Sequence, residues 1–318
     1  MRQLGKTDIR ISPIGLGCWQ FSRGTGMAGK YWDPLDDSTV RDIVDESLKG
    51  GVTWFDTAEM YGRGRSEESL SGALKALNRS PGTVVIATKW WPLFRTARSI
   101  IRTVDDRLNA LGGFPIDLHQ IHWPYSLSTL KRQMDAMVTL LEEGKIRSIG
   151  VSNFSARQME MCHRLLSERG HVLASNQVRY NLLDRRIETS GVLETARELG
   201  ITIIAYSPLA QGILTGKFHD DPSLIRTRQG ARRRRRAFQE SGLKKTAPLI
   251  AKLRDLGQKY QVSPSQVALN WVIHSQGEIV VAIPGASKAR QARENAAAMS
   301  FELSENELAS LQQKSPRE

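Results

Sequence analysis

Three apolar segments of this 318-residue chain each lead to a side chain that can hold or transfer a proton. The first segment ends at Asp56, and Tyr61 follows five residues further on. The second is followed by Lys89 and the third by His122. An acid, a phenol, an ammonium and an imidazole can together deliver a proton to an oxygen on which negative charge develops. The spacing therefore indicates an acid–base site, provided that the three segments end side by side.

Each of these residues also has an ordinary structural explanation when it is considered alone. Asp56 could cap a turn, and Tyr61 could pack with its hydroxyl in water. His122 could be a hydrogen-bonded core histidine, whereas a buried Lys89 needs a partner such as Asp56. Taken together the four favour catalysis, because a lysine ammonium lowers the pKa of a neighbouring phenol and an aspartate keeps that lysine charged. The histidine can then orient a carbonyl oxygen.

Apolar β-branched runs alternate with amphipathic stretches over most of the sequence, which predicts parallel strands joined by helices. The predicted strands are Ile14–Gly17, Val52–Asp56, Val84–Thr88, Leu118–His122, Ile149–Ser152, Ser175–Val178, Thr202–Tyr206 and Val280–Pro284. The predicted helices are Ser38–Lys49, Ser66–Leu77, Thr96–Leu111, Ser128–Glu143, Ala156–Arg169, Val192–Leu199, Ser265–Ser275 and Ala289–Ala298, with a final one opened by Ser304–Glu307. Eight such units can close into a barrel whose strand ends share one face. We therefore predict an α/β fold, a (β/α)8 TIM barrel, as a single domain over residues 1–318.

A doubly wound open sheet is the competing architecture. It would carry a Gly-x-Gly-x-x-Gly fingerprint after an early strand, and the sequence Ile14–Cys18 lacks that spacing. The first twelve residues predict a short hairpin before the barrel. About forty residues from Ser207 to Thr246 form a long link after the seventh strand, on the face expected to hold the active site. The last helices are additions after the eighth strand.

The composition is that of a soluble globular protein, with 40% hydrophobic and 25% charged residues. Two cysteines do not make a disulfide framework, and the first residues lack the apolar core of a signal peptide. No run approaches the roughly twenty apolar residues of a membrane span. We expect a cytoplasmic protein with no membrane partner. The net charge of +12 would attract polyphosphate ligands, nucleic acid or acidic membranes.

The motifs around the acid–base residues resemble those of the aldo-keto reductases, nicotinamide-dependent carbonyl reductases built on a TIM barrel. The resemblance covers essentially the whole chain. It rests on Phe55–Gly62, Thr88–Lys89, Gln120–Pro124, Gly150–Phe154, Gln177, Tyr206–Leu209 and Ile283–Lys288. It implies that Asp56, Tyr61, Lys89 and His122 are the catalytic tetrad, with Tyr61 as general acid. It also implies hydride transfer from NADPH to an aldehyde or ketone.

The resemblance further implies a set of NADPH-binding residues. Ser152, Asn153 and Gln177 would meet the nicotinamide carboxamide, and Tyr206 would stack on the ring. The residues implied at the pyrophosphate and adenosine are Ser207, Leu209, Gln211, Gly212, Leu214, Lys217, Pro284, Gly285, Ser287, Lys288, Gln291, Glu294 and Asn295. A hydroxyl, an ammonium and a helix N-terminus near the 2′-phosphate favour NADPH over NADH. Many family members carry an arginine where this chain has Gln291, so the strength of that preference stays open.

Four tryptophans, Trp19, Trp90, Trp91 and Trp123, follow predicted strand ends. Ordinary packing is the alternative, but we expect these loop residues to line an apolar substrate pocket. The implied substrate is an aldehyde or ketone with an apolar or aromatic body. The sequence names neither that substrate nor the direction of flux nor the oligomeric state.

The arginine run Arg232–Arg236 lacks interleaved aromatics and any nucleic-acid motif, so we expect no nucleic-acid partner. The run could form a solvated face, or one or two of its arginines could lie near the cofactor phosphates. A non-enzymatic alternative is a cofactor-binding regulatory subunit resembling potassium-channel β subunits. We expect no metal, because only one of the six histidines follows a strand, too few for the ligand set of a metal-dependent barrel enzyme.

Overall fold

A computed structural model describes residues 1–25, 32–225 and 236–315. Eight parallel strands form one sheet in the order β10-β9-β8-β7-β6-β5-β4-β3, so strands that are successive in sequence are neighbours in space. Their bounds are β3 (Leu16–Gly17), β4 (Trp54–Asp56), β5 (Val85–Trp90), β6 (Leu118–Ile121), β7 (Ile149–Ser152), β8 (Leu173–Arg179), β9 (Thr202–Tyr206) and β10 (Val280–Ala282). Lys89 of β5 lies opposite Gln120 of β6, so the strand ends that carry polar side chains are in register.

The sheet closes on itself between its first and last strands. Parallel bridges join Ile14 to Ala282 and Gly17 to Gly285. The amide of Gly17 also donates a hydrogen bond to the carbonyl oxygen of Pro284 over 3.1 Å. Closure satisfies backbone groups that an open sheet would leave at its two edges. The predicted TIM-barrel fold is therefore confirmed.

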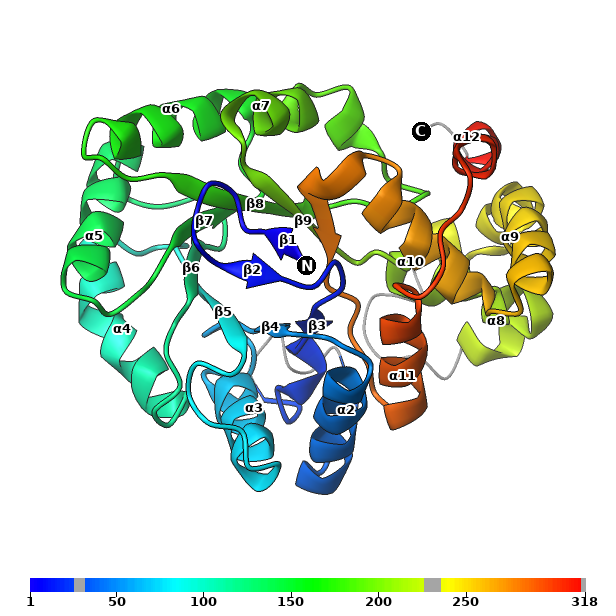
Figure 1. The fold of residues 1–318 in the computed structure, drawn as a ribbon, viewed down its shortest axis with the longest axis horizontal. Helices are drawn as coiled ribbons and strands as arrows, with labels where there is room; N and C mark the ends of the chain where they lie inside the picture. Colours follow the sequence, from blue (N-terminus) through cyan, green and yellow to red (C-terminus); the bar gives the residue numbers. More distant parts are fainter. Residues whose placement is uncertain (26–31, 226–235, 316–318) are drawn as a thin grey trace.

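Helices surround the barrel, as Figure 1 shows. The barrel helices are α2 (Asp37–Lys49), α3 (Arg65–Ala76), α4 (Arg98–Ala110), α5 (Leu130–Glu142), α6 (Ala156–Ser167), α7 (Val192–Leu199), α10 (Pro264–His274) and α11 (Ala289–Ala297). In α2 the side chains of Val40, Ile43 and Val44 are buried; the last two follow Val40 by three and four residues and so lie on the same apolar stripe. This helix packs against α3 and α11. The same spacing rule explains why the predicted helices and the observed ones coincide closely.

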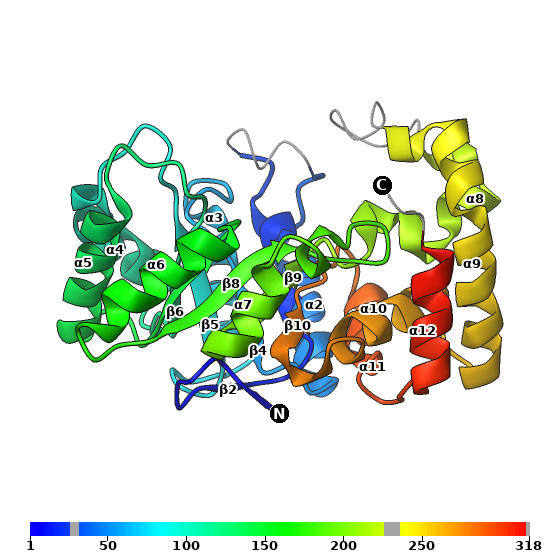
Figure 2. The same cartoon turned by 90° about the horizontal axis from the view of Figure 1, so that it is seen from above.

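The predicted hairpin precedes the barrel as β1 (Arg2–Gln3) and β2 (Arg10–Ile11), which pair in antiparallel fashion. Figure 2 shows it along the lower edge of the molecule. Its buried residues Leu4, Ile9 and Ile11 belong to one apolar cluster inside the barrel. The strands contribute Trp54, Ala87, Leu118, Ala174, Ile204 and Val281 to this cluster, and Ile283 joins it just after β10. The hairpin therefore closes the end of the barrel where the strands begin.

The segment after β9, predicted as a long link from Ser207 to Thr246, carries helices that were not predicted from the sequence. It contains α8 (Lys217–Asp220) and the 21-residue α9 (Glu240–Tyr260). Pro248 within α9 obscured the helical pattern, because proline usually interrupts a helix. The helix nevertheless buries a regular stripe that includes Leu249, Ile250, Leu253 and Leu256. It packs against α10 and against α12 (Glu305–Lys314), the final helix that the sequence predicted.

Two further sequence features can be placed only in part. Most of the Arg232–Arg236 run falls in residues 226–235, outside the described residues, and Arg236 alone lies within them. Across residues 1–25, 32–225 and 236–315, no helix has both the length and the apolar character that crossing a membrane requires.

Candidate active site

A buried ion pair occupies the end of the barrel interior where the strands finish. Asp56 ends β4, and Lys89 lies near the end of the neighbouring β5. The Lys89 Nζ lies 2.5 Å from Asp56 Oδ1, and neither side chain is exposed to solvent. The ammonium also donates to the carbonyl oxygen of Thr57 over 2.8 Å. Parallel strands bring both side chains together because all their C-terminal ends face the same way.

Tyr61 lies beside this ion pair, in the loop that follows β4. The Lys89 Nζ is 5.0 Å from the centre of the Tyr61 ring. Trp19 stacks on the Tyr61 ring at a centroid distance of 6.0 Å, and the His122 ring meets it edge-on at 5.8 Å. The structure thus brings the four predicted acid–base residues from three strand ends to one place.

Burial dominates the proton equilibria of this group. Burial raises the pKa of Tyr61, although the Lys89 ammonium acts in the opposite direction. Lys89 thus lowers the Tyr61 pKa as predicted, but the net shift is upward, because desolvation of the phenolate is the larger effect. Burial also opposes the charge on Lys89, but Asp56 and Tyr61 outweigh it and raise the Lys89 pKa. Burial and the nearby Lys89 charge hold the pKa of His122 well below its usual range.

Three protonation states follow at neutral pH: a phenol on Tyr61, an ammonium on Lys89 and an uncharged imidazole on His122. The phenol retains a proton that it can donate, and the ammonium is placed to stabilise the phenolate left behind. The Nδ1 of His122 is buried and has no hydrogen-bond partner among the described residues. The group can therefore act as a proton donor with a neutral hydrogen-bonding histidine beside it.

Two side-chain amides hold the second oxygen of Asp56. Gln177 donates to Oδ2 over 2.8 Å and Gln120 donates to it over 3.2 Å. Sequence reasoning missed Gln120. Its position two residues before His122 was the available signal, because alternate residues of a strand point to the same face. Gln177, predicted to meet the nicotinamide, therefore also contacts the acid–base group directly.

The other predicted nicotinamide-binding residues form a chain of hydrogen bonds at the ends of β7 and β9. The Tyr206 hydroxyl donates to Asn153 Oδ1 over 3.0 Å, and Asn153 Nδ2 donates to Ser152 Oγ over 3.0 Å. The Ser152 hydroxyl donates in turn to the carbonyl oxygen of Gln177 over 2.9 Å. Asn153 has a φ of 61°, in the left-handed region that asparagine tolerates better than most residues. This polar chain therefore adjoins the acid–base group through Gln177.

The turn after β9 carries the residues predicted at the pyrophosphate. Gln211 and Gly212 have φ angles of 58° and 100° inside this turn. A Cβ on Gly212 would meet the Phe218 ring at 3.3 Å, so glycine relieves both the backbone conformation and the contact. The side chain of Leu214 is buried in the core and leaves only its backbone for a ligand. The same segment holds Ser207, Leu209 and Lys217.

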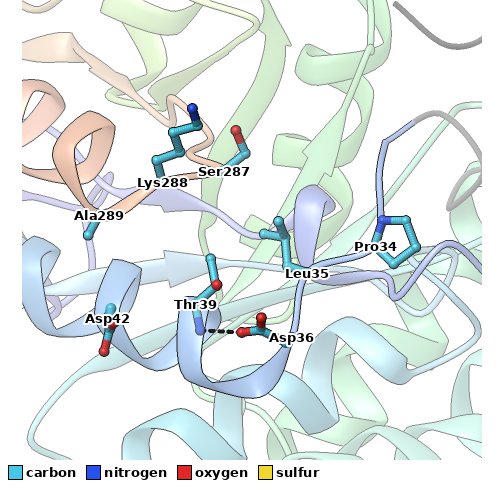
Figure 3. Close-up of a pocket in the computed structure, with 8 residues that line it drawn as sticks. All are labelled: Pro34, Leu35, Asp36, Thr39, Asp42, Ser287, Lys288 and Ala289. Carbon is cyan, nitrogen blue, oxygen red and sulfur yellow. Dashed lines mark hydrogen bonds between the residues drawn. The ribbon is translucent and has the colours of Figure 1, made fainter.

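The residues predicted at the 2′-phosphate line a recess of about 400 Å³ between the N-terminal ends of α2 and α11. Figure 3 shows Ser287 and Lys288 on one wall, across from α2. Asp36 and Asp42 lie on the α2 side. Asp36 caps α2 by accepting a hydrogen bond from the Thr39 amide over 2.6 Å. The residues that line the recess thus include one ammonium, on Lys288, and the hydroxyls of Ser287 and Thr39, together with two carboxylates that would oppose a phosphate.

The remaining predicted adenosine residues make contacts within the chain. Gln291 accepts hydrogen bonds from the Ser287 amide over 2.9 Å and from the Ser287 hydroxyl over 3.1 Å. Asn295 is buried and donates to the carbonyl oxygen of Gly285 over 3.4 Å. Glu294 lines a different recess, beside α9 and α10. The structure therefore groups Gln291 with Ser287 but places Glu294 apart from them.

Aromatic rings surround the acid–base group. The Trp91 ring meets His122 edge-on at 5.3 Å. Trp123, which follows His122 in sequence, stacks on Tyr125 at 5.9 Å. Trp19 and Trp91 therefore contact the tyrosine and the histidine directly, whereas the ring contact of Trp123 is with Tyr125, and all three tryptophans are partly buried.

Trp90 is not one of these partly buried rings. Its side chain is 1% exposed, and the indole N–H donates to the Ser99 hydroxyl of α4 over 3.0 Å. Successive residues of a strand point to opposite faces, so Trp90 turns toward the helices while Lys89 turns into the barrel. The prediction that Trp90 lines the substrate pocket is therefore wrong.

A closed (β/α)8 barrel with a phenol, an ammonium and an imidazole at its strand ends is the architecture of a barrel enzyme that handles protons. No three His, Cys, Asp or Glu side chains in the described ranges are arranged to hold a metal ion. A model of the aldo/keto reductase family matches residues 13–316. The chain therefore belongs to the aldo/keto reductase family, as its motifs predicted. The protein is an oxidoreductase whose family acts on carbonyl compounds.

Known proteins of this family resemble the chain along most of its length. An uncharacterized oxidoreductase of Mycobacterium tuberculosis (strain ATCC 25618 / H37Rv) is 38% identical over 93% of this chain and 86% of its own. Aldo-keto reductase YhdN of Bacillus subtilis is 33% identical over 91% of this chain and 85% of its own.

Solved structures of the family share the fold. A glycerol dehydrogenase of Gluconobacter oxydans matches with a TM-score of 0.84 and 28% identity, over 98% of this chain and 94% of its own. An aldo/keto reductase of Klebsiella pneumoniae in complex with NADP and acetate matches with a TM-score of 0.75 and 27% identity, over 99% of this chain and 95% of its own.

Proposed function

We propose that this protein reduces an aldehyde or ketone to an alcohol with NADPH, and that Tyr61 is the general acid. The observation that carries the proposal is the convergence of the phenol, the buried Lys89–Asp56 pair and His122 at one end of the barrel. Bound NADPH would supply the hydride. The carbonyl oxygen, as it gains charge, would take its proton from Tyr61.

The proton inventory of the site supports this direction of transfer. Tyr61 holds its proton because burial raises its pKa, and the oxyanion formed by hydride addition is a strong base that removes it. Lys89 stays charged and stabilises the phenolate that results. His122 is uncharged and can orient the carbonyl oxygen through a hydrogen bond without competing as an acid.

The residues present fit a nicotinamide dinucleotide. Amide and hydroxyl groups at Ser152, Asn153 and Gln177 suit a carboxamide, which both donates and accepts hydrogen bonds. Gly212 permits close backbone approach to a pyrophosphate. Lys288 would hold the 2′-phosphate. The Klebsiella pneumoniae enzyme crystallised with NADPH, 26% identical to this chain, supports the choice of cofactor.

The surface around the site supports a substrate with an extended apolar body. Four of the six exposed large apolar side chains in the described ranges lie in the loops after β5 and β6. They are Leu93, Phe94, Tyr125 and Leu127, of which Phe94 is 82% exposed and Leu127 69%. Trp91 and Trp123 lie at the start of these two loops. An aryl or long alkyl aldehyde could therefore reach from His122 to this exposed rim.

The test is NADPH oxidation by the wild type and Tyr61→Phe with a series of aromatic and aliphatic aldehydes. We expect kcat to fall by about 10²- to 10⁴-fold, because the general acid is lost while the ring remains. NADPH affinity, followed by fluorescence, should stay the same. Tyr260→Phe is the matched control, since it removes a hydroxyl from α9 that bonds Glu307, far along the chain from the site.

Equal rates for wild type and Tyr61→Phe would overturn the assignment of Tyr61. A wild type that binds NADPH tightly and turns over no carbonyl would instead support the regulatory-subunit alternative.

A further inference from the structure

Glu59 is a charged residue outside the acid–base group that links two of the loops at the active site. It lies two residues before Tyr61, and its side chain is only 10% exposed. Its Oε1 accepts a hydrogen bond from the backbone amide of Trp91 over 2.6 Å. The same oxygen pairs with the guanidinium of Arg95. One carboxylate therefore joins the loop that carries the acid to the loop that carries an aromatic wall.

The other oxygen of Glu59 belongs to a chain of buried charges behind the loop. Arg107 of α4 places its Nη1 3.5 Å from Oε2 of Glu59. The Nε of Arg107 lies 3.4 Å from the carboxyl group of Glu67 in α3. Glu67 accepts a hydrogen bond from the Thr88 hydroxyl of β5 over 2.6 Å. Glu59 is thus connected, through Arg107 and Glu67, to two helices and to β5, the strand that carries Lys89.

Arg95 extends the same connections to a third loop. Its guanidinium donates to the hydroxyls of Ser99 over 3.1 Å and Thr103 over 3.0 Å, both on α4. Its carbonyl oxygen accepts from the Leu127 amide over 3.0 Å and from the Ser126 hydroxyl over 2.9 Å. The loop after β6, which begins at the catalytic histidine position, is therefore held through the loop after β5.

We infer that Glu59 is a positioning residue that sets the acid and the substrate wall relative to each other, and this inference rests on the proposed function. Charge-assisted hydrogen bonds are stronger than neutral ones. A mostly buried carboxylate also loses stability if it leaves its donors, so Glu59 has few alternative positions. Tyr61 reaches the reacting oxygen only if its loop keeps its place, and misplacement by about 1 Å can cost 10²-fold in rate. Trp91 is set by the same oxygen atom.

The experiment compares Glu59→Ala and Glu59→Gln with the wild type, using one short aldehyde and one bulky aromatic aldehyde. Glu68→Gln is the matched control, because the Glu68 side chain is exposed and forms an ion pair with Arg65 on the same helix, α3. We expect Glu59→Ala to lower kcat about 10- to 100-fold for both substrates. The KM of the bulky aldehyde should rise more than that of the short one, because the Trp91 wall loosens. Glu59→Gln should fall between, since its amide oxygen can still accept from the Trp91 amide.

A second readout does not depend on turnover. Amide hydrogen exchange at Trp91 and across residues 126–127 should be faster in Glu59→Ala than in the wild type, and unchanged in Glu68→Gln. If Glu59→Ala does not fold, Arg95→Met tests the same connection from the exposed side and should raise the same KM. Wild-type kcat, KM and exchange in a folded Glu59→Ala protein would overturn the inference.

An inactive wild type would count against the proposed function alone, because the exchange result would still test how Glu59 holds the loops.

Discussion

The two ends of the barrel interior are built from the same strands and do opposite things. At the end where the strands begin, the interior is an apolar cluster closed by the N-terminal hairpin. At the end where they finish, it holds a buried ion pair and the amides that bind it. We call the apolar cluster the lower layer of the interior and the polar group the upper layer. On three strands, a residue of the lower layer lies two positions before a residue of the upper layer. The pairs are Trp54 and Asp56, Ala87 and Lys89, and Leu118 and Gln120.

Burial at the apolar end should contribute most of the stability of the barrel interior, whereas the polar end holds the predicted acid–base residues. Each apolar side chain buried in the lower layer contributes about 1.5–3 kcal/mol. The charges of the upper layer contribute little net stability, because desolvation offsets most of their attraction. Substitutions in the two layers should therefore separate loss of fold from loss of activity.

The largest expected effect comes from breaking the ion pair. Lys89→Met should abolish measurable carbonyl reduction, because nothing then stabilises the phenolate of Tyr61. It should also lower the free energy of unfolding by about 3–5 kcal/mol, because Asp56 is left as a buried, unpaired charge. The double variant Asp56→Asn/Lys89→Met should regain most of that stability and remain inactive. Urea unfolding and NADPH oxidation measure the two effects, and a Lys89→Met protein as stable as wild type would contradict the reasoning.

A change in the lower layer should do the reverse. Ile11 of the hairpin is wholly buried in the apolar cluster. Ile11→Ala should lower the free energy of unfolding by about 2–5 kcal/mol, through lost burial and the cavity left behind. The kcat and KM of the remaining folded protein should match those of the wild type, measured well below the new melting temperature. A large fall in kcat at full folding would show that the two ends are coupled.

The smallest expected effect concerns Glu67, a buried carboxyl group behind the upper layer, and its influence on the free energy of unfolding. Burial raises the pKa of Glu67 from its ordinary 4.5 to about 7, with Arg107 opposing that rise. Between these values the folded protein keeps a proton that the unfolded chain releases. Rising pH should therefore reduce the free energy of unfolding, by no more than about 3 kcal/mol, and the loss should be complete above pH 7.

Glu67→Gln tests this prediction, since glutamine does not ionise and its amide oxygen can still accept a hydrogen bond from the Thr88 hydroxyl. Unfolding measured at several pH values from 4.5 to 8 should show a smaller decline for the variant than for the wild type. Parallel curves for the two proteins would mean that Glu67 ionises in the folded state at its ordinary pKa.

The fold was predictable because it repeats. Eight apolar runs, each followed by an amphipathic stretch, indicate a barrel even when individual boundaries shift by a few residues. The exceptions are local. The long helix α9 contains Pro248, which breaks the helical pattern in the sequence. The first strand is Leu16–Gly17 rather than Ile14–Gly17, and Ile14 forms an isolated bridge to Ala282 before it. The hairpin was predicted correctly from the alternation of apolar and polar residues in Ile9–Ser12, which follow Asp8.

The site was predictable to the level of residue type and strand, but not to the level of contacts. Strand alternation could have excluded Trp90 from the pocket and pointed to Gln120, since both follow from the position of a neighbour already identified. The hydrogen bonds of Gln177 to Asp56 and of Gln291 to Ser287 depend on segments far apart in sequence or on a local turn. No spacing rule gives them.

Periodicity and motifs alone indicated the barrel, the family and four candidate acid–base residues, because both are local properties of the chain. Only the tertiary structure decided the net effect on the Tyr61 pKa, since that depends on how completely the surrounding residues exclude water from the phenol, against the opposing effect of Lys89. It alone also connected Glu59 to Trp91 and Arg107, because a buried carboxylate takes whichever donors packing brings within reach.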